Sequence, residues 1–263
     1  MKLGKSQWLA VVTAAILFAG LYWGLDIKPD RQKQVEKTRA LSAESTDIAV
    51  LLRDARQALS PADAALIDGL DAGLAAEKAD TARIPGLQQL AGAWYNLKRP
   101  DISGYYAEQI AQQIGTAETW SIAGTTYTLC VRQADMPATR DFCVKRAVQA
   151  FENAISLEPD SIAHRVNLAL LYTETAEPMK GIQMLLGLND SNPDNEIVLF
   201  QLGRLAIQSG QYDRAVERLE KVLQLKPDNS QAPCLLVQAY EGLQQNEKAA
   251  LYRSRCLTLT GQQ

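Results

Sequence analysis

The sequence predicts an all-α protein in which one N-terminal transmembrane helix precedes a row of stacked helix hairpins. Two observations support this prediction. Residues Trp8 to Leu25 form an uncharged apolar run of 18 residues, and a helix of this length, about 27 Å, just crosses the hydrocarbon core of a bilayer. Further along the chain, Pro159, Pro193 and Pro227 follow one another at intervals of 34 residues. Such a period is typical of proteins built from repeated helix pairs.

Small and apolar residues precede the first and third of these prolines at matching distances. They are Ala147, Phe151 and Ala154 before Pro159, and Ala215, Leu219 and Val222 before Pro227. Within each set the spacing is i, i+4, i+7, which places the side chains on one face of a helix. Continued past Pro227, the register predicts a tyrosine-type position at 240 and an alanine-type position at 249. The chain has Tyr240 and Ala249 there.

A short motif indicates which kind of repeat this is. The sequence Trp120-x2-Ala123-Gly124-x2-Tyr127 resembles the first half of the tetratricopeptide repeat (TPR) signature, and the spaced prolines resemble its end. The resemblance implies a right-handed α-solenoid of paired helices, as in membrane-anchored bacterial proteins of this family. On this interpretation, Gly124 lets Ala147 of the second helix approach closely. The flanking rings of Trp120 and Tyr127 then fill the wider gaps.

The register divides the chain into segments. They are a short N-terminal tail (1–7), a transmembrane anchor (8–27), a charged linker (28–45), degenerate helical hairpins (46–116), a modified repeat (117–161) and three regular repeats (162–195, 196–229 and 230–263), the last four forming the solenoid 117–263. The packing positions of the solenoid are Trp120, Gly124, Tyr127, Ala147, Phe151, Pro159, Tyr172, Pro193, Gly203, Ala215, Pro227, Tyr240 and Ala249. In the modified repeat we expect the first helix to end near residue 130, with the eleven extra residues 131–141 lying in a loop at 131–142.

The first helix of each repeat is expected to line the concave side, where the resemblance implies that a peptide or a partner's helix binds. Carried over by register, the inward positions are Ser121, Thr125, Thr128, Val166, Leu170, Thr173, Phe200, Arg204, Ile207, Gln231, Gln238 and Glu241. Some relatives hold a C-terminal carboxylate there with asparagines and several Lys or Arg residues. Here Asn167 occupies one such position, and Ser121, Thr125, Ile197 and Gln201 occupy the others. With Arg204 as the single cation, we expect no binding of this kind.

The N-terminal apolar run has the flanks of an uncleaved signal anchor. Lys2 and Lys5 precede it, and Trp8 and Trp23 lie where aromatic residues meet the membrane interfaces. The alternative is a cleaved signal peptide, which would need small residues near the end of the run, where large ones stand. The orientation stays open from this segment alone. The Lys and Arg residues of the linker favour the cytoplasm for the domain that follows, whereas the cysteines favour the opposite side.

The four cysteines pair by position within two predicted helix hairpins. Cys130 and Cys143 flank the expected loop, and Cys234 and Cys256 lie near opposite ends of the last helix pair. Because hairpin helices are antiparallel, each pair can meet and form a disulfide. The alternative is four buried free thiols. Disulfides favour an extracytoplasmic, for instance periplasmic, compartment.

Composition argues against several classes of function. The formal net charge of −3 leaves no large basic surface for nucleic acid. A single histidine, His164, interpreted as an ordinary helix-surface residue, argues against a metal site built on several imidazoles. The chain shows no Gly-rich phosphate-binding loop. We therefore expect no cofactor, no metal and no catalytic residues.

The most favoured function is a membrane-tethered scaffold that binds a protein or peptide in its concave groove. The alternatives are a self-associating component of an envelope assembly or of a complex of the cytochrome-maturation type, and a hydrolase that uses loop 131–142. For the hydrolase, the candidate side chains are Asp135, Arg140 and Asp141. A carboxylate and arginine cluster in a loop is more often a solvated turn.

Overall fold

The structure is a computed structural model that describes residues 47–260. The predicted tail, anchor and linker (1–7, 8–27 and 28–45) lie outside the described residues. Within residues 47–260, no helix combines the length and the apolar character needed to cross a membrane.

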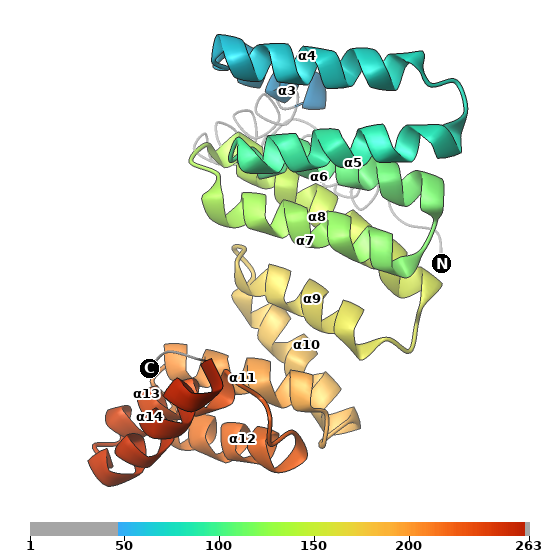
Figure 1. The fold of residues 1–263 in the computed structure, drawn as a ribbon. Coiled ribbons are helices and arrows are strands. Elements are labelled where there is room, and N and C mark those ends of the chain that lie inside the picture. The colour runs from blue at the N-terminus through green and yellow to red at the C-terminus, as the bar shows by residue number, and fades with distance from the viewer. Residues whose placement is uncertain (1–46, 261–263) are drawn as a thin grey trace, which may run out of the picture. The chain divides into compact units, whose positions relative to one another are not determined.

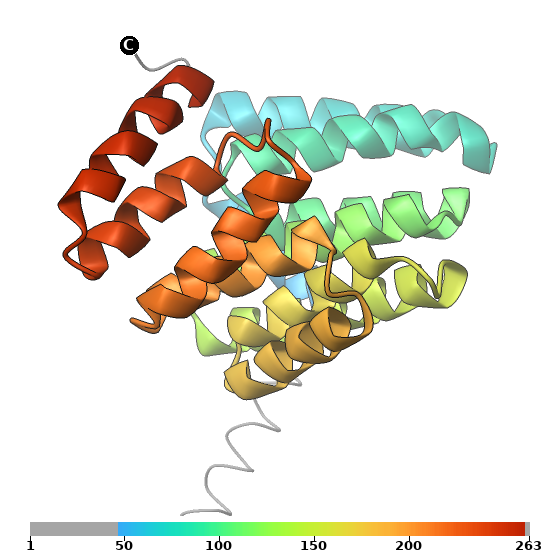
Figure 2. The same ribbon diagram turned by 90° about the horizontal axis from the view of Figure 1, so that it is seen from below.

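The described chain is entirely helical, as predicted, and contains twelve helices and no strand between residues 47 and 260. They are α3 (Ile48–Gln57), α4 (Pro61–Ala76), α5 (Asp80–Asn96), α6 (Pro100–Ile114), α7 (Ala117–Gln133), α8 (Pro137–Leu157), α9 (Ile162–Thr173), α10 (Pro178–Ser191), α11 (Glu196–Gln208), α12 (Tyr212–Leu225), α13 (Ala232–Gly242) and α14 (Asn246–Thr260). From α4 onward each helix packs against the next one in the chain (Figures 1 and 2). The result is a stack of helix hairpins.

Polar caps and prolines determine where many of these helices begin and end. The side chains of Ser60, Thr116 and Asn195 accept hydrogen bonds from backbone N–H groups in the first turns of α4, α7 and α11. Such caps satisfy donors that have no partner inside the helix. The prolines spaced by 34 residues lie exposed, each two residues beyond the last residue of α8, α10 or α12. Because proline disfavours the helical conformation of the residue before it, it stops each second helix at the same register position.

A glycine in a first helix accommodates a large side chain from the second helix of the same hairpin. A Cβ atom added to Gly124 would lie 2.7 Å from the ring of Phe151, and one added to Gly203 would lie 2.8 Å from Leu219. The sequence predicted that Gly124 lets Ala147 approach closely, and the atoms nearest to the added Cβ belong to the ring of Phe151. Ala147 is fully buried and packs in the cluster that also contains Tyr127 and Phe151. Gly124 therefore makes room for the ring of Phe151.

The predicted packing residues fall into three groups. Tyr127, Ala147, Phe151, Gly203, Ala215, Tyr240 and Ala249 are buried, while Trp120 and Tyr172 are partly buried against neighbouring clusters. Pro159, Pro193 and Pro227 are exposed. The prolines thus terminate helices without contributing to the core.

A buried polar network links α6, α7 and α8. The hydroxyl of Tyr127 donates to Glu108 at 2.9 Å, and Arg146 donates to the same carboxylate at 3.1 Å. Burial and the neighbouring Glu108 raise the pKa of Tyr127, so that the phenol stays protonated as a donor. Because the carboxylate and the hydroxyl are both satisfied, the network is compatible with a buried position.

The structure contradicts the expected loop at 131–142. Helix α7 continues to Gln133 and α8 already begins at Pro137, so only residues 134–136 connect them. The extra residues lengthen both helices, to 17 and 21 residues. Asp135 lies in the short connection, whereas Arg140 and Asp141 lie on α8. The proposed hydrolase therefore lacks the loop on which it depended.

Both predicted cysteine pairs are joined. Cys130 and Cys143 have Cα atoms 6.0 Å apart and connect α7 to α8, and Cys234 and Cys256 have Cα atoms 4.9 Å apart and connect α13 to α14. The alternative of four free thiols was therefore wrong. Each disulfide lies inside one hairpin.

The contact between Gly124 and Phe151 gives a test of the packing. We expect Gly124→Ala to lower the free energy of unfolding by about 1–3 kcal/mol, because the buried ring of Phe151 has little room to move away. Gly187→Ala in α10 is the matched control, since a Cβ there would meet nothing within 4 Å. It should instead stabilise the helix by about 0.5–1 kcal/mol. Urea unfolding of both variants measures the difference, and equal effects would contradict the proposed contact.

Candidate partner groove on the first helices

The first helices of the hairpins form a continuous surface. Helix α7 contacts α9, α9 contacts α11, and α11 contacts α13. Two hollows lie on this surface, with volumes of about 300 and 320 Å³. The first is lined by Glu118, Ser121, Ile122, Thr125, Thr126, Ala163, His164 and Asn167, and the second by Tyr95, Thr125, Thr126, Thr128, Leu129, Arg132, Phe151, Asn167 and Leu170. They share Thr125, Thr126 and Asn167 and so adjoin one another.

Threonines give the walls of these hollows their particular chemistry. The hydroxyls of Thr125, Thr126 and Thr128 each donate to the carbonyl four residues earlier in α7, at 2.8 to 2.9 Å. Their hydrogens are therefore used inside the helix, while their oxygens can still accept. Across the groove, Asn167 of α9 donates to the hydroxyl of Ser121 at 3.3 Å. The walls thus offer methyl groups and acceptors more than free donors.

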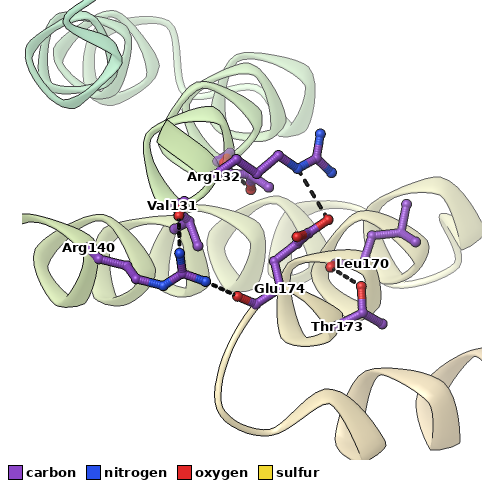
Figure 3. Close-up of polar contacts among 8 residues, drawn as sticks. Val131, Arg132, Arg140, Leu170, Thr173 and Glu174 are labelled. Carbon is purple, nitrogen blue, oxygen red and sulfur yellow. Dashed lines mark hydrogen bonds and ion pairs between the residues drawn. The ribbon is translucent and has the colours of Figure 1, made fainter. Parts of the chain in front are cut away.

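Charged side chains gather where α7 meets the end of α9. The Nε atom of Arg132 lies 3.2 Å from the carboxylate of Glu174. Arg140 donates to two backbone carbonyls, that of Val131 at 2.6 Å and that of Glu174. Figure 3 shows both arginines reaching Glu174, Arg140 at its backbone carbonyl and Arg132 at its carboxylate. Arg140 therefore binds the C-terminal ends of α7 and α9 together, where a helix has unsatisfied carbonyls and favours a cation.

Arg204 of α11 adds a second groove cation near Arg132. Burial lowers the pKa of Arg204, and repulsion from Arg132 lowers it further, while Glu174 partly offsets both. Its Nε atom and the Oε1 atom of Gln201, one turn earlier, are buried without a hydrogen-bond partner among residues 47–260. The expectation of a single cation in the groove was therefore wrong.

The predicted groove positions are distributed unevenly. Ser121, Thr125, Thr128 and Leu170 line the hollows. Val166 is only 1% exposed and belongs to the core, so it is not available to a partner. Phe200 and Ile207 pack against another core cluster while keeping part of their surface open, and the hydroxyl of Thr173 donates to Leu170 O. Gln231, Gln238 and Glu241 are exposed at the last hairpin, where Glu241 pairs with Arg253.

Sequence reasoning missed three groove residues. Tyr95 lies on α5, in the segment where the repeat register is weakest, and its side chain is exposed beside α7. Arg132 was assigned to the loop that does not exist. Glu174 follows the last residue of α9, just beyond the face counted by register. The register could have found Arg132 only if α7 had been extended by another turn.

His164 differs from its interpretation as an ordinary surface residue. It is 9% exposed, and its Nε2 atom lies 3.3 Å from the carboxylate of Glu158. Within the described part of the chain, no group of three or more His, Cys, Asp or Glu side chains has a geometry that could hold a metal ion.

Comparison with known proteins identifies the repeat. The tetratricopeptide repeat family model matches residues 206–251, which run from the end of α11 into α14. These residues thus match one tetratricopeptide repeat segment. No curated protein matches it in sequence.

Several solved structures resemble this chain at low identity. A MamA crystal structure is 18% identical and has a TM-score of 0.43, covering 67% of this chain and 91% of MamA. YrrB, titled a TPR protein with an unusual peptide-binding site, is 16% identical with a TM-score of 0.41, covering 70% and 94%. The Cut9–Hcn1 hetero-tetramer is 12% identical with a TM-score of 0.49, covering 68% and 33%.

The double carbonyl contact of Arg140 can be tested in the stack of helices. We expect Arg140→Met to lower the free energy of unfolding by about 1–3 kcal/mol, because two helix ends lose a charged donor. Arg53→Met is the control, since Arg53 is mostly exposed and its ion pair within residues 47–260 is with the adjacent Asp54. Its effect should stay below about 0.5 kcal/mol. Chemical denaturation decides, and an Arg140 variant as stable as the control would show that the contact does not hold α7 to α9.

Proposed function

We propose that the protein is a membrane-tethered adaptor that binds a protein or peptide along the surface of α7, α9 and α11 and catalyses no reaction. The observation that carries the proposal is the pair of adjoining hollows between α7 and α9. Side chains from α5, α7 and α9 line them, so the site depends on the stacking of several hairpins. An extended surface of this kind is how repeat proteins usually bind other polypeptides.

The chemistry of the groove supports binding more than catalysis. The threonine hydroxyls that line it donate to carbonyls of their own helix, so no side-chain base receives their protons. A nucleophile would need a base within hydrogen-bond reach. His164, which also lines the first hollow, contacts Glu158 and not a hydroxyl of the groove.

The tether and the compartment are part of the proposal. The apolar run Trp8 to Leu25 would anchor the chain, and the following linker would hold the TPR domain near the membrane. Two disulfides support an extracytoplasmic location, because cytosolic thiols are kept reduced. The Lys and Arg residues of the linker favour the opposite orientation. We give the disulfides more weight, because the cytosol keeps thiols reduced.

Site-specific crosslinking tests the binding surface. A photoreactive residue replacing Thr125, which is exposed in both hollows, should crosslink the full-length protein to a discrete partner in its native membrane. The same residue replacing Glu217, exposed on α12, is the matched control and should give no such product. Equal products from both positions would contradict groove binding. A product made only of two copies of this chain would favour the self-associating alternative.

Thiol chemistry in intact cells tests the compartment. A membrane-impermeant reductant should free two thiols quickly, because Cys234 and Cys256 are partly exposed, whereas Cys130 and Cys143 are 2% and 0% exposed. Mass-tagging of the denatured protein counts the thiols. The Cys234→Ala/Cys256→Ala variant is the control and should lose the fast step. Four tagged thiols without any reductant would place the domain in the cytoplasm.

A further inference from the structure

The groove holds more positive than negative charge where α7, α9 and α11 meet. Arg132 and Arg204 influence each other electrostatically, and Glu174 is the carboxylate that acts on both. Arg140 already donates hydrogen bonds to the backbone carbonyls of Val131 and Glu174. The two groove arginines thus share one carboxylate, and one positive charge is left without a counter-charge.

Arg132 is arranged so that it can bind a second carboxylate. It contacts Glu174 through Nε at 3.2 Å, the one contact drawn for it in Figure 3, and its two terminal nitrogens make no hydrogen bond within residues 47–260. The side chains of Arg132 and Glu174 are 45% and 37% exposed, so the pair is open to solvent. A planar guanidinium can hold two acceptors on different edges, which lets a ligand bind without displacing Glu174.

Arg204, unlike Arg132, has no carboxylate at ion-pair distance within residues 47–260. It is half-buried. Its Nε atom is also buried without an acceptor. A charge that has lost part of its hydration and has no partner is unfavourable in the free protein. A carboxylate of a bound ligand would supply the charge partner that the guanidinium of Arg204 lacks.

The neighbouring hollow adds an apolar requirement. Tyr95, Leu129 and Leu170 line the hollow of about 320 Å³, and Arg132 lines it as well. A ligand whose carboxylate reaches Arg132 therefore has an apolar cavity immediately beside that carboxylate. The first-helix surface continues beyond Arg204 toward α13, so a bound chain need not end there.

We propose that the groove binds an internal peptide segment in which an acidic side chain lies beside a large apolar one. The carboxylate lies between Arg132 and Arg204, and the apolar side chain enters the hollow lined by Tyr95 and Leu170. Since Glu174 already neutralises one of the two arginines, the remaining charge matches one carboxylate better than a doubly charged phosphate. This inference rests on the proposed groove function and specifies its ligand.

A displayed peptide library tests the proposal with the full-length protein in detergent. The library consists of random 12-residue peptides fused at both ends, so that the displayed segment has no free carboxyl terminus. We expect the wild type to enrich peptides with an Asp or Glu beside a large apolar residue about tenfold over the unselected library, as a charge-assisted contact allows. Arg132→Gln and Arg204→Gln should lose this preference. Arg214→Gln, an exposed arginine on α12, is the matched control and should keep it.

The outcomes separate the two proposals. Enriched peptides without acidic residues, or an acidic preference that survives both groove substitutions, would overturn the carboxylate site but leave groove binding in place. No enriched peptide at all would overturn the peptide ligand proposed here, while the crosslinking at Thr125 decides separately whether the groove binds a partner. A second library with free C-termini is selected in parallel. If acidic preference appears only there, as a terminal carboxylate, the assignment to an internal side chain is wrong.

Thermal unfolding of the same variants distinguishes a binding role for Arg204 from a structural one. Because its Nε atom has no acceptor, Arg204→Gln should unfold at the same temperature as the wild type or higher. A clearly lower unfolding temperature would show that Arg204 supports the fold, and it would overturn its assignment as a ligand-binding residue.

Discussion

Burial of large side chains against glycines of the adjacent helix is the constraint on which the stack depends. The ring of Phe151 lies over Gly124, and Leu219 lies over Gly203 in the same way two hairpins later. These contacts bring the helices of a hairpin close enough to bury the apolar face that neither could bury alone. The repeated spacing then sets the first helices side by side, and the groove is a consequence of that spacing.

Much of the helical architecture could be predicted from local sequence signals, because each repeat buries its residues against near neighbours. The prolines mark helix ends, the Trp120 motif specifies contacts with the adjacent helices, and each cysteine pair specifies a contact within one hairpin. The prediction was wrong at 131–142, because the spacing of the regular repeats was applied there and the extra residues were assigned to a loop. Helices can absorb such residues by growing longer, and Pro137 offers a ready start for α8. A fixed repeat length of 34 residues does not predict such longer helices.

The groove was harder to predict than the fold because it depends on contacts between hairpins. Register placed Val166 on the open face, but the crossing of α9 with its neighbours buries it. Tyr95 enters from a helix whose repeat pattern is weak, and Arg132 acts electrostatically on Arg204 from two hairpins earlier in the chain. Single-residue exposure in a stack depends on the angle between hairpins, and no local motif encodes that angle.

The placement of the two disulfides has a mechanical consequence. Each covalent link joins the helices of one hairpin, α7 to α8 or α13 to α14, and neither crosses to another hairpin. Oxidation thus makes these hairpins stiff as individual units while the junctions between hairpins keep only non-covalent contacts. Any bending of the stack would therefore concentrate at α8–α9 and the junctions that follow, beside the groove. The groove could then widen or narrow around a bound polypeptide while the helices that line it stay intact.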